Sequence, residues 1–266
     1  MIKPGEIQKA ASANNVSDTQ IEKDYIISWI LFGISRNVFL NQHLVFKGGT
    51  VLKKVYFNEY RFSEDLDFTL TDDAITNENI FEEFENVFAF ILDEANIQLK
   101  RISVETFQTG NMNCYVVYGG PMGGTFGKKD LKLDFTRNEQ IIYDVPLSPV
   151  FRNYSDLSDA FSLQCYSLSE VLVEKMRSLI ERSQPRDIYD LWFLLDDYGI
   201  ALADHIGGFH QKMAHKGLEP SGYLEKLKSK ESVFKGMWDK SLKNQIHQLP
   251  DFDGVFRVLM KHFRTL

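Results

Sequence analysis

The hydrophobic period changes along this chain, and that change restricts the fold more than any other feature. Residues 18–35 and 76–96 show the helical period. Ser17 precedes the first of these helices and would supply the hydroxyl of a Ser-x-x-Gln capping box. Strand-like runs lie between and after them, at 44–46, 62–70, 102–107, 113–118 and 131–135. From Pro149 onward the patterns are helical only, with helices expected at about 168–182 and 186–198, the first behind a Ser167-x-x-Glu170 capping box. This order predicts an α+β domain followed by a C-terminal helical bundle.

Length and composition suit a globular protein of two modest domains. The chain has 266 residues, 44% of them hydrophobic, and we place the domains at 1–165 and 166–266. The longest apolar run, Tyr25–Ile34, is about half of the ~20 residues that a membrane span needs, so no membrane partner is expected. The sequence starts without a basic-then-apolar leader and has only 2 cysteines, which favours a cytoplasmic location.

Charge is distributed unevenly between the two parts of the chain. The formal net charge is −7, but residues 201–266 hold 11 Lys/Arg against 7 Asp/Glu, a balance of +4. The acidic total argues weakly against a nucleic-acid partner, whereas the basic last quarter is compatible with one. Composition alone therefore does not decide whether the protein binds nucleic acid.

Three aspartates on strand-like runs carry the clearest chemical signal. Asp65 and Asp67 alternate with apolar residues, so both point to one face of a strand, roughly 7 Å apart at Cα. Two carboxylates this close repel each other unless a cation lies between them, and Mg²⁺ prefers such oxygen ligands together with substrate phosphates. Asp134, within Lys132–Phe135, offers a third carboxylate from another strand.

A glycine pair precedes these carboxylates. Gly48 and Gly49 allow backbone N–H groups to approach a phosphate, and a helix that starts near Thr50 would direct its positive end at it. Phosphate and metal together predict a phosphoryl- or nucleotidyl-transfer site. A glycine pair or an Asp-x-Asp strand alone is more often a turn or an exposed sheet face, but their order and spacing favour the site.

These segments together resemble a known family. Lys47-Gly48-Gly49-Thr50-x-Leu52-x-Lys54, followed by Arg61-Phe62-Ser63-Glu64-Asp65-Leu66-Asp67-Phe68, is similar to the AbiEii/MenT-type nucleotidyltransferases. The resemblance continues through Lys132-Leu133-Asp134, Glu174-Lys175 and Arg182-x-x-Pro185-Arg186-Asp187-x-Tyr189-Asp190, and covers residues ~20–195. That family comprises toxins of type IV toxin–antitoxin and phage-defence systems within the DNA polymerase β-like superfamily. The Gly-rich run at 119–127 departs from the family pattern and has no assigned role.

The resemblance implies a nucleotidyltransferase fold with a small mixed sheet flanked by helices, and roles for particular residues. Asp65, Asp67 and Asp134 would bind Mg²⁺ in a two-metal site, with Mn²⁺ as an alternative, and Asp134 would help to deprotonate the acceptor. Gly48, Gly49 and Thr50 would hold the phosphates of an NTP. Lys175 would neutralise phosphate charge, and Asp187 and Asp190 would orient its helix or the nucleotide, so that the helices at about 168–198 complete the active site. By residue type alone, Asp187 would compensate the dipole of its helix.

The expected function is therefore a Mg²⁺-dependent nucleotidyltransferase toxin. It would move NMP from an NTP to an acceptor hydroxyl, with the 3′ end of a tRNA as the expected RNA acceptor and a cognate antitoxin as partner. One alternative keeps the chemistry and modifies a protein or a small molecule. Another is a non-catalytic nucleotide-binding module, which the three retained like charges disfavour.

Overall fold

The computed structural model describes residues 1–266, which divide into two compact units. The first unit comprises Met1–Glu139 and Val145–Tyr166, and the second comprises Gln140–Asp144 and Ser167–Leu266.

The first unit is built on a five-stranded mixed sheet of order β1-β2-β5-β4-β3. Strands β2 and β5 are parallel, and the other neighbours are antiparallel. The strands are β1 (Leu44–Lys47), β2 (Asp65–Leu70), β3 (Gln98–Thr106), β4 (Met112–Gly119) and β5 (Asp130–Thr136). The predicted α+β fold with a small mixed sheet is confirmed.

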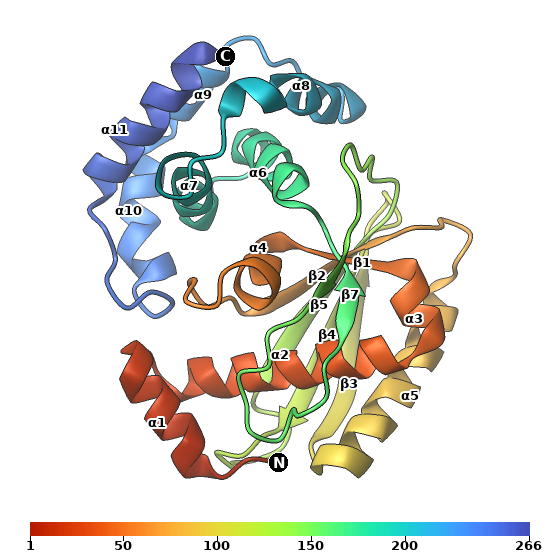
Figure 1. Ribbon diagram of the computed structural model, residues 1–266. Helices are drawn as coiled ribbons and strands as arrows, with labels where there is room; N and C mark the ends of the chain where they lie inside the picture. The colour runs from red at the N-terminus through yellow and green to blue at the C-terminus, as the bar shows by residue number, and fades with distance from the viewer. The chain divides into compact units, whose positions relative to one another are not determined.

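The first unit also contains helices. They are α1 (Pro4–Asn14), α2 (Asp18–Arg36), α3 (Val38–His43), α4 (Gly48–Val51), which continues as the π-helical turn η1 (Leu52–Tyr56), and α5 (Asn77–Ala95). Helix α2 runs across the strands, and α5 lies beside it (Figure 1). The two approach closely because Gly33 has no side chain: a Cβ there would lie 2.7 Å from Val87 Cγ1. Phe84 of α5 meets Phe135 of β5 edge to face, with ring centroids 5.6 Å apart.

Strand alternation leaves the opposite face polar. Leu66 and Phe68 of β2 and Leu133 and Phe135 of β5 are buried in the core, so the residues between them point to the other side. Those residues are the predicted aspartates. The amphipathic pattern of the sheet therefore decides which face is available for chemistry.

The start of strand β2 differs from the sequence-based expectation. Strand β2 begins at Asp65 and not at Phe62. Just before the strand, backbone carbonyls accept hydrogen bonds from side chains. Arg61 Nη1 donates to the carbonyl of Phe62, and Gln20 Nε2 donates to that of Ser63. Gln20 belongs to the predicted capping box, whose Ser17 hydroxyl accepts the N–H of Gln20 as expected.

The short sheet of β6 (Leu147–Pro149) and β7 (Ser162–Gln164) was not predicted. Each strand has 3 residues, which is too short for a periodic pattern to appear. The segment continues to β1, where the N–H of Tyr166 donates to the carbonyl of Phe46 at 3.0 Å.

The second unit is helical, as predicted for this part of the chain. Its helices are α6 (Leu168–Glu181), α7 (Pro185–Trp192) with the π-helical turn η2 (Phe193–Asp197), the 3₁₀ turn η3 (Leu202–His205), α8 (Ile206–His215), α9 (Tyr223–Ser229), α10 (Glu231–Leu242), α11 (Phe252–His262) and the 3₁₀ turn η4 (Phe263–Thr265).

The capping box predicted at α6 forms only in part. Ser167 accepts the N–H of Glu170, but the Glu170 carboxylate is fully buried and accepts the N–H groups of Ile142 and Tyr143, both at 2.9 Å. These two bonds attach residues 140–144 to the helical unit. The side chain predicted to cap the helix therefore holds a distant segment of the chain.

Candidate active site

The turn between β1 and α4 requires both of its glycines. Gly48 has φ of 78°, which favours glycine, and a Cβ there would collide with the Asp67 carboxylate. A Cβ at Gly49 would lie 2.6 Å from Nη2 of Arg61, whose side chain is buried. The backbone of this turn therefore lies directly against one predicted catalytic carboxylate and one guanidinium.

Thr50 has a different contact from the one expected. It is buried, and its hydroxyl donates to the backbone carbonyl of Asp65 at 2.6 Å. In the structure Thr50 thus ties α4 to the first residue of β2, and its predicted phosphate contact stays a prediction.

The register of β2 and β5 brings the predicted carboxylates together. Asp67 pairs with Asp134, and Asp65 pairs with Lys132, in the parallel ladder. Because alternation puts residues two apart on one face, all four side chains share the polar face of the sheet. The same cross-strand row extends to Lys47 on β1 and to Asn113 on β4.

Lys132 supplies a positive charge to these carboxylates. Its Nζ lies 2.8 Å from each oxygen of Asp134, but only the contact with Oδ2 has hydrogen-bond geometry. Asp134 Oδ1 is buried without a hydrogen-bond partner. Burial opposes protonation of Lys132, yet its contact with Asp134 and the charges of Asp65 and Asp67 raise its pKa.

Asp134 is the carboxyl most affected by this environment. Burial and the negative charge of Asp67 raise its pKa to about 6, although Lys132 acts in the opposite direction. A buried oxygen that accepts no hydrogen bond and a neighbouring like charge both favour a cation at this position.

The donor set fits a hard divalent cation, but it is not preassembled. Carboxylate oxygens are the ligands that Mg²⁺ prefers, and Asp65, Asp67 and Asp134 provide them on one face. No group of three or more His, Cys, Asp or Glu side chains is arranged as a ready metal site. The Lys132 ammonium lies against Asp134.

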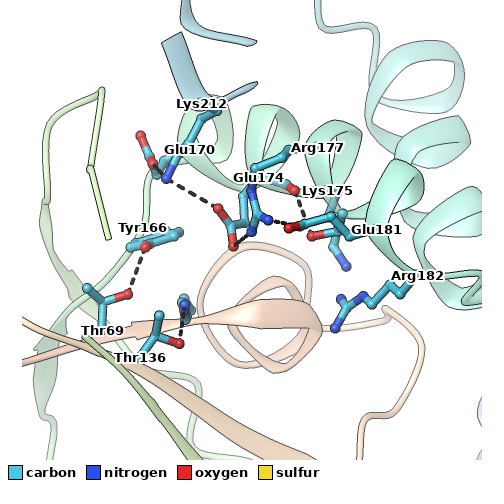
Figure 2. A network of polar contacts seen from close by, with 12 residues as sticks. Thr69, Thr136, Tyr166, Glu170, Glu174, Lys175, Arg177, Glu181, Arg182 and Lys212 are labelled. Carbon is cyan, nitrogen blue, oxygen red and sulfur yellow. Dashed lines mark hydrogen bonds and ion pairs between the residues drawn. The ribbon is translucent and has the colours of Figure 1, made fainter. Parts of the chain in front are cut away.

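Lys47 is a second cation on this face that the sequence did not reveal as a site residue. It is 7% exposed, donates to Thr136 Oγ1 at 2.9 Å and lies 5.7 Å from the ring centroid of Tyr166. The Tyr166 hydroxyl in turn contacts Thr69 Oγ1 (Figure 2). Side-chain alternation along β5 predicts that Lys132 shares the face of Asp134. The position of Lys47 on this face follows only from the register of β1 against β2, which the sequence alone does not give.

The remaining predicted residues form a cluster in the helical unit. Lys175 of α6 lies 3.0 Å from Asp187 and 2.5 Å from Asp190, both on α7, and all three are buried. Arg182, in the loop between the helices, pairs with Asp187 at 2.9 Å. Burial would raise the pKa of Asp187, but Lys175 and Arg182 outweigh it and the pKa lies below its ordinary value.

This cluster refines what the sequence suggested. Asp187 lies in the first turn of α7, as dipole compensation requires, and both aspartates contact the ammonium of Lys175 directly. The predicted site residues thus form two groups, the aspartates with Gly48, Gly49 and Thr50 in the first unit and Lys175, Asp187 and Asp190 in the second.

A second buried ion network in the helical unit was not predicted. Lys212 of α8 is fully buried and contacts Glu170 at 2.6 Å and Glu174 at 3.2 Å, and Arg177 links Glu174 to Glu181 (Figure 2). Lys212 lies far from Glu170 and Glu174 in sequence, so no local pattern could have identified these two contacts. Since burying these charges is tolerable only while they are paired, the network fixes α8 on α6.

The comparisons with known proteins agree with this geometry. The sequence model described as "Nucleotidyl transferase AbiEii toxin, Type IV TA system" matches residues 29–258. The chain therefore belongs to the AbiEii family of nucleotidyltransferase toxins of type IV toxin–antitoxin systems, and it is a nucleotidyltransferase. No curated protein sequence matches the chain.

Solved structures show the same fold. MenT4, a nucleotidyltransferase toxin from Mycobacterium tuberculosis H37Rv, is 17% identical with a TM-score of 0.69, and the match covers 99% of this chain and 89% of MenT4. JHP933 from Helicobacter pylori is 16% identical with a TM-score of 0.59, over 94% of this chain and 92% of that one. None of the helices combines the length and apolar character that a membrane span needs.

Proposed function

We propose that this nucleotidyltransferase toxin transfers NMP from an NTP to a hydroxyl of RNA, with the 3′ end of tRNA as the acceptor, in a Mg²⁺-dependent reaction. The proposal is supported above all by the cross-strand pair Asp67–Asp134 beside the glycine turn at 48–49. It places carboxylates for a cation next to backbone that can approach a phosphate. Family membership supports the NTP substrate and an antitoxin partner, and we place the protein in phage defence.

Each residue has a definite task in this reaction. Asp65, Asp67 and Asp134 would hold Mg²⁺, which when bound offsets the negative charge of the triphosphate and the departing pyrophosphate. The Gly48–Gly49 backbone would position the phosphates, with the charge of Arg61 directly behind Gly49. Asp134 would accept the proton of the attacking hydroxyl, and Lys175 would balance phosphate charge, held in place by Asp187 and Asp190.

Labelled NTPs and total RNA test the activity. The wild-type protein should label RNA in the presence of Mg²⁺, and Asp67→Asn should lower the rate about 100-fold or more because charge stabilisation at the reacting phosphate is lost. Asp130→Asn is the matched control, since Asp130 lies on the same strand as Asp134 but is exposed.

Several outcomes would contradict the proposal. Wild-type protein that labels no RNA, or full labelling by Asp67→Asn, excludes this chemistry at this site. Labelled protein without labelled RNA would assign a different acceptor. Calorimetry that detects no Mg²⁺-dependent NTP binding would favour a non-catalytic partner module. By contrast, relief of growth inhibition by a co-expressed neighbouring gene would support the proposal and identify the antitoxin.

A further inference from the structure

Lys132 occupies the position where a cation is needed. It precedes Asp134 by two residues on β5, so both side chains project from the polar face, and its register partner is Asp65. Its Nζ lies 2.8 Å from both Asp134 oxygens. An ammonium and a metal ion therefore compete for the same carboxylate.

The ammonium satisfies this carboxylate only in part. One hydrogen bond reaches Oδ2, while the buried Oδ1 is left without a hydrogen-bond partner. Lys47, the second cation on this face, donates to Thr136 Oγ1. Lys132 carries one positive charge, whereas a divalent ion would bring two to the face that Asp65, Asp67 and Asp134 share.

We propose that Lys132 is the built-in counter-cation of the metal-free site and that it must release Asp134 before a divalent cation can bind there. This inference rests on the proposed metal-dependent function and deepens it. Lys132 lowers the affinity of the protein alone for metal, because binding must break its ion pair. A nucleotide removes that penalty, since its phosphates offer the displaced ammonium a new partner. Metal and nucleotide thus bind cooperatively, and Lys132 carries part of the coupling.

Mn²⁺ binding to the full chain without nucleotide, measured by electron paramagnetic resonance, tests this directly. Lys132→Met should bind Mn²⁺ at least tenfold more tightly than the wild type. Lys132→Arg, which keeps the charge, should stay within about threefold of it. Lys128→Met removes an exposed lysine from the same hairpin and should also leave the affinity unchanged. Lys132→Gln provides a second neutral side chain, and thermal melting reports whether each variant is folded.

Repeating the titration with a non-hydrolysable NTP analogue measures the coupling. The quantity compared is the factor by which the analogue raises the Mn²⁺ affinity. This factor should be at least tenfold smaller in Lys132→Met than in the wild type. A purely structural lysine would change the melting temperature without changing this ratio.

The outcomes separate this inference from the proposed function. If the wild type binds Mn²⁺ and neither neutral variant binds it more tightly, the counter-cation role is wrong and the metal site stands. If no variant binds Mn²⁺ with or without the analogue, both ideas are wrong. If Lys132→Met and Lys132→Gln remain unfolded in saturating Mn²⁺, Lys132 is a structural residue and the inference fails.

Discussion

At the scale of single residues, the site depends on an absent side chain as much as on charged ones. Gly48 combines a positive φ with an Asp67 carboxylate that leaves no room for a Cβ. Either property would favour glycine, but only the second connects the turn to the chemistry. The two can be separated because Gly123 also has a positive φ, of 65°, with nothing within 4 Å of its Cβ position.

We expect Gly48→Ala to lower the transfer rate about 100-fold or more and to destabilise the protein by about 1–2 kcal/mol. The backbone strain accounts for the loss of stability, and displacement of Asp67 accounts for the lower transfer rate. Gly123→Ala should cost a similar backbone penalty of about 1 kcal/mol with activity retained. Labelling assays and urea unfolding of both variants measure this, and equal activity in the two would refute the role of the contact.

At the scale of elements, ion pairs buried between helices join α6 to α7. Lys175 contacts Asp187 and Asp190, and Arg182 adds a further pair to Asp187. Removing one partner of a buried pair leaves an uncompensated charge, and this lowers the free energy of unfolding by far more than the intact pair raises it. The dependence on pH follows from the lowered pKa of Asp187.

Asp187→Asn should destabilise the protein by about 3 kcal/mol at pH 7. Because the folded pKa lies below the unfolded value of about 3.9, the stabilisation by Asp187 is complete above that pH and is lost as the pH falls through the folded pKa. The difference between wild type and variant should therefore be constant from pH 7 to about 5 and shrink below about 4. Urea unfolding at several pH values measures it, with the exposed Asp239→Asn as control. A difference that grows on acidification would contradict the assignment.

Elements also show where prediction from sequence stopped. The helix at 76–96 and the strand at 113–118 were recognised because their periodicity lies within one segment, and α5 and β4 confirm them. The sheet of β6 and β7 was missed because 3-residue strands carry no period. Glu170 was misread as a cap because its buried partners, Lys212 and the N–H groups of Ile142 and Tyr143, come from elsewhere in the chain.

At the scale of the whole molecule, charge distribution matters more than net charge. The total of −7 includes the carboxylates of the proposed metal site, whereas residues 201–266 carry a balance of +4. The exposed lysines of the second unit include Lys226, Lys228, Lys240 and Lys243, which would contact the backbone of the proposed RNA acceptor. Such contacts release counterions and are sensitive to salt.

Replacing these four lysines with serine should lower kcat/KM for RNA about tenfold or more, with a weaker salt dependence and unchanged NTP binding. The control replaces four exposed lysines of the first unit, Lys3, Lys9, Lys100 and Lys128. RNA labelling at increasing salt concentrations and calorimetry with NTP measure the two effects. Equal losses in both sets would show that only total charge matters.

The amino-acid sequence by itself determined the α+β class, the helical second part, and the motif residues Gly48, Gly49, Asp65, Asp67 and Asp134, because alternation, capping and short motifs are local. Only the tertiary structure decided that Asp67 pairs with Asp134, that Lys132 lies on Asp134, and that Lys175 is paired with two aspartates. These contacts depend on strand register and helix packing. Both are set by burying apolar side chains such as Phe68 and Phe135 across segments distant in the chain.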